Sequence, residues 1–171
     1  RRRPTPVRRC GGPPPRHARR AAGAEAMPFF HDQDRSGLRR HYLEAWRKAR
    51  EGRLLEPLGH QLATVIEQHP EYHPLFEDET AALGRDYTPE SAQSNPFLHL
   101  GLHLAIREQV ATDRPPGIAA VHRELSLRLG DVHEAEHRMM ERLGEALWLS
   151  QRSGRPPDEA AYLESLRRIG T

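Results

Sequence analysis

The sequence lacks the features that mark secreted and membrane proteins. It has one cysteine, Cys10, in 171 residues, so the chain can form no internal disulfide framework and no cluster of thiolate metal ligands. No apolar run approaches the roughly 18 residues that a membrane span needs, and the first residues lack the apolar core of a secretory signal. We therefore expect a cytoplasmic protein that does not associate with membranes.

Charge is unevenly distributed along the chain. Residues 1–26 are rich in arginine and proline and contain eight arginines against one glutamate. They show no hydrophobic periodicity, so we expect a disordered tail, translated from upstream sequence ahead of a start at Met27. A basic arm for nucleic acid and an organelle transit peptide are the alternatives. Residues 27–171 contain 18 basic and 23 acidic side chains, which argues against nucleic acid as a partner of the folded part.

Alternation of apolar and polar residues, the sign of β-strands, is absent as well. Apolar residues instead recur at helical spacing, which predicts an all-α fold. We expect a compact bundle of five to six helices in a single domain over 27–171, with 70–95 as a long irregular connection. Asn95 and Pro96 form a good helix start, and the following residues are apolar on nearly every side, so the helix at 96–112 should be central. The apolar stripes of the six candidate helices fall at 38–49, 58–69, 96–112, 118–129, 132–152 and 162–169.

Histidines on two of these helices are the strongest functional lead. His99 and His103 share a stripe with aliphatic residues, and His133, Glu136 and His137 lie within the apolar arc of their helix. Imidazoles at positions i and i+4 present nitrogens from adjacent turns to one point, the spacing at which a helix chelates a metal ion. We therefore predict a site for a transition metal such as zinc, iron or manganese, with Glu136 either ligating the ion or orienting a ligating imidazole.

Two further histidine positions are less favourable. His122 also lies on an apolar stripe, so a third helix could contribute to the site. The pair His69 and His73 straddles Pro70 and precedes Pro74. Because proline disfavours the helical conformation of the preceding residue, we expect this pair outside regular helix, with the weakest claim to the site.

Two other functions fit the same residues. The histidines could be structural, hydrogen-bonded in the interior of a non-catalytic protein–protein interaction module that binds a partner or a second copy of itself. Alternatively, HEAEH at 133–137 satisfies the HExxH pattern of zinc hydrolases, in which Glu134 would be the catalytic base. Such a site would also need a third ligand and a substrate cleft, and the sequence marks neither.

Three segments, NPFLHLGLHLAIREQVATDRPPGI, GDVHEAEHRMMERLGEALWLSQR and HPEYHPLF, together resemble a bacterial family known as domain of unknown function 1841. The resemblance spans Met27 to Ile169. It implies a small cytoplasmic protein that begins near Met27, in agreement with the interpretation of the tail. It implies no activity, because the family has no assigned function.

Overall fold

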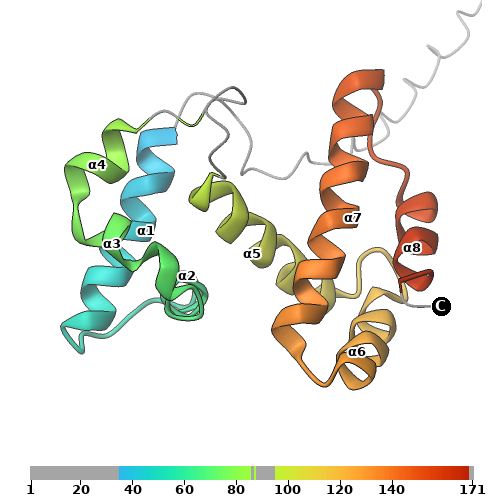
Figure 1. The fold of residues 1–171 in the computed structure, drawn as a ribbon, viewed down its shortest axis with the longest axis horizontal. Helices are drawn as coiled ribbons and strands as arrows, with labels where there is room; N and C mark the ends of the chain where they lie inside the picture. Colours follow the sequence, from blue (N-terminus) through green and yellow to red (C-terminus); the bar gives the residue numbers. More distant parts are fainter. Residues whose placement is uncertain (1–34, 86, 88–94, 170–171) are drawn as a thin grey trace, which may run out of the picture. The chain divides into compact units, whose positions relative to one another are not determined.

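The computed structural model describes residues 35–85, 87 and 95–169, and within these ranges every regular element is helical (Figure 1). The tail predicted at 1–26 lies outside the described residues. None of the helices found here is long and apolar enough to cross a membrane. The elements are, in chain order, α1 (Arg35–Arg50), α2 (Pro57–Glu67), the 3-10 turn η3 (Pro70–Tyr72), α3 (His73–Glu77), α4 (Glu79–Gly84), α5 (Pro96–Thr112), α6 (Ile118–Leu129), α7 (Val132–Ser153) and α8 (Glu159–Arg167).

The all-α prediction is confirmed, but the predicted number of five to six helices is wrong. Residues 35–85, 87 and 95–169 contain eight α-helices, because part of the predicted connection at 70–95 is itself helical. Pro70 and Pro74 lie in the first turns of η3 and α3, where a missing backbone N–H costs nothing. Asp78 then caps α4, its side chain accepting a hydrogen bond from the backbone of Ala81 at 3.0 Å. Pro70 and Pro74 thus each lie at the start of a short helical segment.

Helix α5 has the bounds that the sequence predicts. The Asn95 side chain accepts hydrogen bonds from the backbone N–H groups of Phe97 and Leu98 at 3.1 and 3.3 Å, and Pro96 occupies the first helical position. The helix ends at Thr112, where Asp113 adopts the left-handed conformation with φ 48°. Because α5 contacts α2, α6 and α7, it needs apolar residues on more than one face.

Two separate apolar cores meet on α5. The N-terminal core combines α1 to α4 with the first half of α5, through Phe97, Leu100 and Leu104. The C-terminal core combines the second half of α5, through Ala105 and Ile106, with α6, α7 and α8. The remaining members of the N-terminal core are Tyr42, Leu43, Ala45, Trp46, Leu62, Val65, Ile66, Phe76 and Ala82. Those of the C-terminal core are Ile118, Leu125, Ala135, Met139, Met140, Leu143, Tyr162, Leu163 and Leu166.

Candidate metal centre

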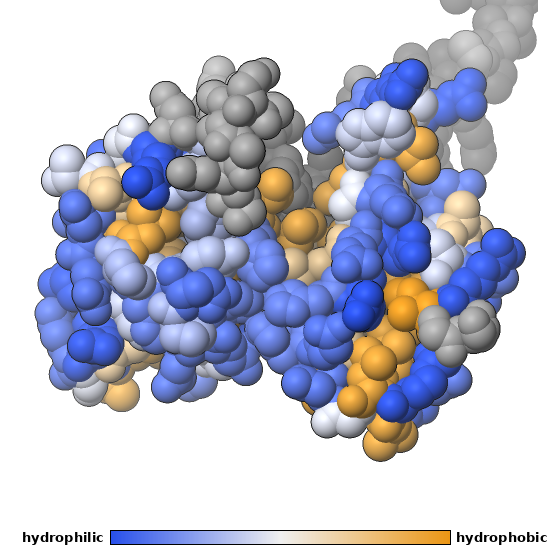
Figure 2. Space-filling view, in the orientation of Figure 1, coloured by the Kyte–Doolittle hydropathy of each residue, from blue (hydrophilic) through white to orange (hydrophobic). Residues whose placement is uncertain are grey.

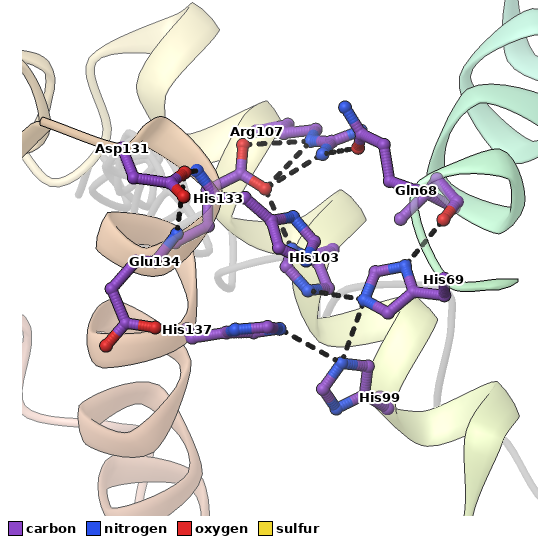
Figure 3. A network of polar contacts seen from close by, with 11 residues as sticks. Gln68, His69, His99, His103, Arg107, Asp131, His133, Glu134 and His137 are labelled. Atoms are coloured by element: carbon purple, nitrogen blue, oxygen red, sulfur yellow. Dashed lines mark hydrogen bonds and ion pairs between the residues drawn. The ribbon is translucent and has the colours of Figure 1, made fainter. Parts of the chain in front are cut away.

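Five histidines from three segments gather where α2, α5 and α7 meet (Figure 3). His99 and His103 stand one turn apart on α5, and His133 and His137 stand one turn apart on α7. His69 comes from the segment just after α2, between Glu67, which ends that helix, and Pro70. The two i, i+4 pairs identified in the sequence therefore face each other, with His69 between them.

Four of these histidines direct nitrogens at a common point. One potential ligating nitrogen from each of His69, His99, His103 and His137 lies within 4.8 Å of all the others. The Nε2 of His69 is 3.1 Å from the Nε2 of His103 and 3.1 Å from that of His99, which is 3.3 Å from the Nε2 of His137. Ligands at the corners of a tetrahedron, each at the usual zinc–nitrogen distance, are separated by about 3.3 Å. The cluster could therefore hold a metal ion.

The hydrogen bonds of the two fully buried histidines settle where their protons are. The Nδ1 of His69 lies 2.6 Å from the carbonyl oxygen of Val65, and the Nδ1 of His103 lies 2.8 Å from Oε2 of Glu136. A carbonyl and an ionised carboxylate can only accept, so each Nδ1 carries the proton and donates it. If both rings are neutral, each Nε2 then bears a lone pair. Two such lone pairs 3.1 Å apart repel each other, and a cation between the two nitrogens, either a proton or a metal ion, would relieve that repulsion.

Glu136 orients His103 and is itself held by Arg107. The Nε of Arg107 donates to Oε1 of Glu136 at 3.0 Å, and its Nη2 donates to Oε2 at 2.8 Å. The same Nη2 donates to Gln68 at 2.6 Å, which ties this network to the end of α2. Burial opposes ionisation of Glu136, but the hydrogen bonds from His103 and Arg107 outweigh it and lower its pKa to about 2. Glu136 is thus an anion that fixes the ring of His103, the usual arrangement behind metal-ligating histidines.

The environment favours the neutral form of three cluster histidines, His99, His103 and His133. Burial, reinforced by the neighbouring histidines, lowers the pKa of His99 to about 4. Burial also lowers the pKa of His103 to about 4, although the Glu136 carboxylate pulls in the other direction. The pKa of His133 is lowered by burial and by His137. Neutral imidazole is the form that binds metals, so these side chains are ready to ligate near pH 7.

His133 belongs to the cluster but not to the set of four converging nitrogens. It forms a second group with His103 and Glu136, whose potential ligand atoms lie within 4.8 Å of one another. Its ring is stacked on that of His103, with an angle of 6° between the planes and 4.8 Å between the centroids. Its Nδ1 is buried and has no hydrogen-bond partner among the residues that the structure describes. A buried polar atom of this kind calls for a partner.

The position of Glu134 does not suit the HExxH interpretation. Its carboxylate accepts a hydrogen bond from Arg138 at 2.8 Å, and its side chain is 42% exposed. Figure 3 shows Glu134 on α7, with no hydrogen bond or ion pair drawn between its carboxylate and the labelled histidines. A catalytic base would have to reach the metal's open side, and Glu134 is engaged elsewhere.

His69 is the residue that sequence reasoning placed lowest, yet the structure brings it into the cluster. Its position three residues after Ile66 continues the apolar stripe of α2, and this was the signal that could have identified it. His73, its partner in the sequence pair, lies elsewhere, with its Nε2 3.0 Å from the carbonyl of Ile66 and its ring against Trp46. His122 is in neither candidate ligand group among the described residues.

Comparison with known proteins gives one match. A family model described as a domain of unknown function (DUF1841) matches residues 34–168. No curated protein and no solved structure matches the chain. The matched range includes all five histidines of the cluster as well as Glu136 and Arg107.

Proposed function

The chain belongs to the DUF1841 family, and from the geometry of its histidine cluster we propose that it is a metal-binding protein whose helices hold one divalent transition-metal ion. The ligands in this proposal are His69, His99, His103 and His137. Glu136 orients one of them from outside the ligand set. The proposal keeps three of the five residues expected from the sequence as ligands, adds His69, and gives His133 and Glu136 other roles.

The observation that carries the proposal is the convergence of four imidazole nitrogens, with the Nε2 atoms of His69 and His103 only 3.1 Å apart. Both His69 and His103 donate their Nδ1 protons to acceptors, so two neutral rings would have no proton for a hydrogen bond between the Nε2 atoms at 3.1 Å. A purely structural histidine pair would be arranged as one donor and one acceptor. A cation between the rings turns this contact from repulsive to favourable.

The donor set narrows the choice of metal. Four imidazoles offer nitrogen only, and imidazole suits zinc, iron, copper and nickel, whereas manganese prefers oxygen ligands. Zinc and iron therefore fit the site better than manganese. The nearby carboxylate of Glu136 is committed to Arg107 and His103, which leaves the ligand set without a negative charge.

The alternative function, a protein–protein interaction module, is supported by a different part of the molecule. Helix α6 carries two exposed leucines, Leu127 at 80% and Leu129 at 41% exposure, and Figure 2 shows apolar surface over this helix. Such a surface could bind a partner or a second copy of the chain. It does not account for the facing lone pairs, so we rank this function second, and the two are compatible with each other.

Metal analysis of the full-length, untagged chain tests the proposal. The protein is purified without chelator, reconstituted with zinc or iron, dialysed, and analysed for metals. We expect about one equivalent of bound metal, and X-ray absorption should show nitrogen ligands at about 2.0–2.1 Å for zinc. The decisive variant is His69→Ala, which should lose bound metal while remaining folded.

The matched control is His41→Ala, which removes a histidine that is exposed on α1. This variant should keep the full metal content, because it leaves the cluster untouched. A parent protein that retains no metal after reconstitution would overturn the proposal. Equal metal content in the His69→Ala and His41→Ala variants would show that the four-histidine ligand set is wrong.

A further inference from the structure

The proposed ligand set carries no net charge, and this affects which molecules the metal site would bind. Within the described residues, the buried charged side chains at the cluster are Glu136 and its partner Arg107, which is partly buried, and these two cancel each other. The imidazole ligands must be neutral to bind. A divalent ion in this site would therefore retain two uncompensated positive charges. A buried charge without a counterion is costly, so the loaded site should attract an anion.

His133 has the geometry of a residue that contacts such an anion. Its ring is parallel to that of His103, and it is not among the four histidines whose ligand atoms all lie within 4.8 Å of one another. His133 is nevertheless close, with its ring centroid 4.3 Å from that of His137 and 4.8 Å from that of His69. Its buried Nδ1 has no partner within the described part of the chain. The residue is thus placed beside the ligand set with one hydrogen-bonding group unused.

The cluster also has a side that solvent can reach. His69 and His103 are 1% and 0% exposed, but His99 and His137 are only partly buried. A small ligand could therefore approach between α5 and α7 without unfolding either helix. A large substrate would need a cleft, whereas a small anion is enough to balance the charge of the ion.

We propose that the metal centre binds a small inorganic or carboxylate anion as an additional ligand, and that His133 donates a hydrogen bond to that anion from Nδ1. This inference depends on the proposed metal site. It assigns His133 to the bound anion instead of to the metal. It also makes the centre an open site that exchanges ligands, as opposed to a closed structural site in which the protein supplies every ligand.

Cobalt substitution with azide as the probe tests the inference. The full chain is loaded with Co²⁺, whose visible absorption reports coordination number, and azide is titrated in. We expect the cobalt spectrum to change with saturable dependence on azide. In His133→Ala, cobalt should still bind with the parent stoichiometry, while the apparent Kd for azide rises about tenfold or more, the loss expected for one hydrogen bond to a charged group.

Two further variants distinguish the loss of the His133 hydrogen bond from a general disturbance of the structure around the site. His133→Asn places an amide donor close to the position of Nδ1 and should recover part of the azide affinity. His122→Ala removes a partly buried histidine that is in neither ligand group and should leave azide binding unchanged.

Each of the following outcomes would contradict either the anion site, the role of His133 or the metal site itself. A cobalt spectrum that azide does not alter would show a closed site and refute the inference. The proposed metal-binding function would not be affected by that result. Loss of cobalt in His133→Ala would make His133 a metal ligand. Equal azide affinity in the parent and His133→Ala would remove its assigned role. Failure of the parent to bind cobalt at all would overturn the metal site and the inference together.

Discussion

At the scale of single residues, the carboxylate of Glu136 fixes the orientation of one proposed ligand, His103. It accepts from Nδ1 of His103 at 2.8 Å and is held by two nitrogens of Arg107, so it cannot turn away from the ring. This fixes the tautomer of His103 and raises the basicity of its Nε2. Glu136 is 4% exposed, so solvent cannot replace it as an acceptor.

Glu136→Gln should therefore weaken metal binding without removing a ligand. We expect metal affinity to fall by about 10–100-fold, the usual cost of losing the partner behind a ligating histidine. Competition with a chelator of known affinity measures this change. Glu134→Gln is the matched control, because Glu134 lies on the same helix but pairs with Arg138 outside the cluster. Equal affinities of the two variants would contradict the role of Glu136.

At the scale of helices, the cluster links two apolar cores that otherwise share α5. His69 follows α2 and is attached to the N-terminal core, whereas His137 lies on α7 in the C-terminal core. His99 and His103 lie on the shared helix. An ion held by all four would therefore tie α2, α5 and α7 together by bonds that neither core supplies.

Metal removal should consequently uncouple the unfolding of the two cores. In the metal-bound protein, we expect the most slowly exchanging backbone amide hydrogens of α2 and those of α7 to have similar free energies of opening. After chelation, α2 and α7 should open at different free energies, because the ion no longer links His69 to His137. Bound metal can contribute about 2.7 kcal/mol at a free concentration one hundred times its Kd. Hydrogen exchange read by mass spectrometry measures both helices.

The variant His69→Gln serves as the control for this effect. It disconnects α2 from the ion, so α2 should open independently of α7 even when metal is present. Opening free energies that are the same with and without metal would show that the ion does not couple the cores.

At the scale of the whole molecule, the stability of the metal-free protein should depend on pH. The pKa of His99 and that of His103 are about 4 in the folded chain, below the ordinary value near 6.5. Between these values the unfolded chain binds more protons than the folded one, so stability falls as pH falls through this window. The pKa of Glu136 is about 2 in the folded chain, below its ordinary value near 4.5. Glu136 therefore extends the loss of stability to pH values below 4.5.

We therefore expect the urea midpoint of the metal-free protein to fall between pH 7.5 and pH 4.5. His99→Gln should reduce this dependence, since His99 is the more exposed of the two histidines and its replacement leaves the Glu136 network in place. Urea unfolding followed by circular dichroism at several pH values provides the measurement. A midpoint that is constant or higher at pH 4.5 would contradict the expectation.

Much of the fold and three of the four proposed ligands follow from local sequence. The all-α class and the bounds of α5 are set by apolar periodicity, by Asn95 as a cap and by Pro96, which act over a few residues. The same periodicity places His99 with His103 and His133 with His137 on apolar faces. The short helices α3 and α4 escaped prediction, because their prolines and their Asp78 cap also fit an irregular connection.

Only the tertiary structure decides which of these side chains meet. His69 enters the cluster because the chain leaves α2 beside α5, a long-range arrangement that the local rule about Pro70 does not contain. Arg107 on α5 donates both to Glu136 on α7 and to Gln68 at the end of α2, and this helps to hold the carboxylate against His103. Helical spacing determines the face on which a residue lies, whereas packing between helices determines what that face contacts.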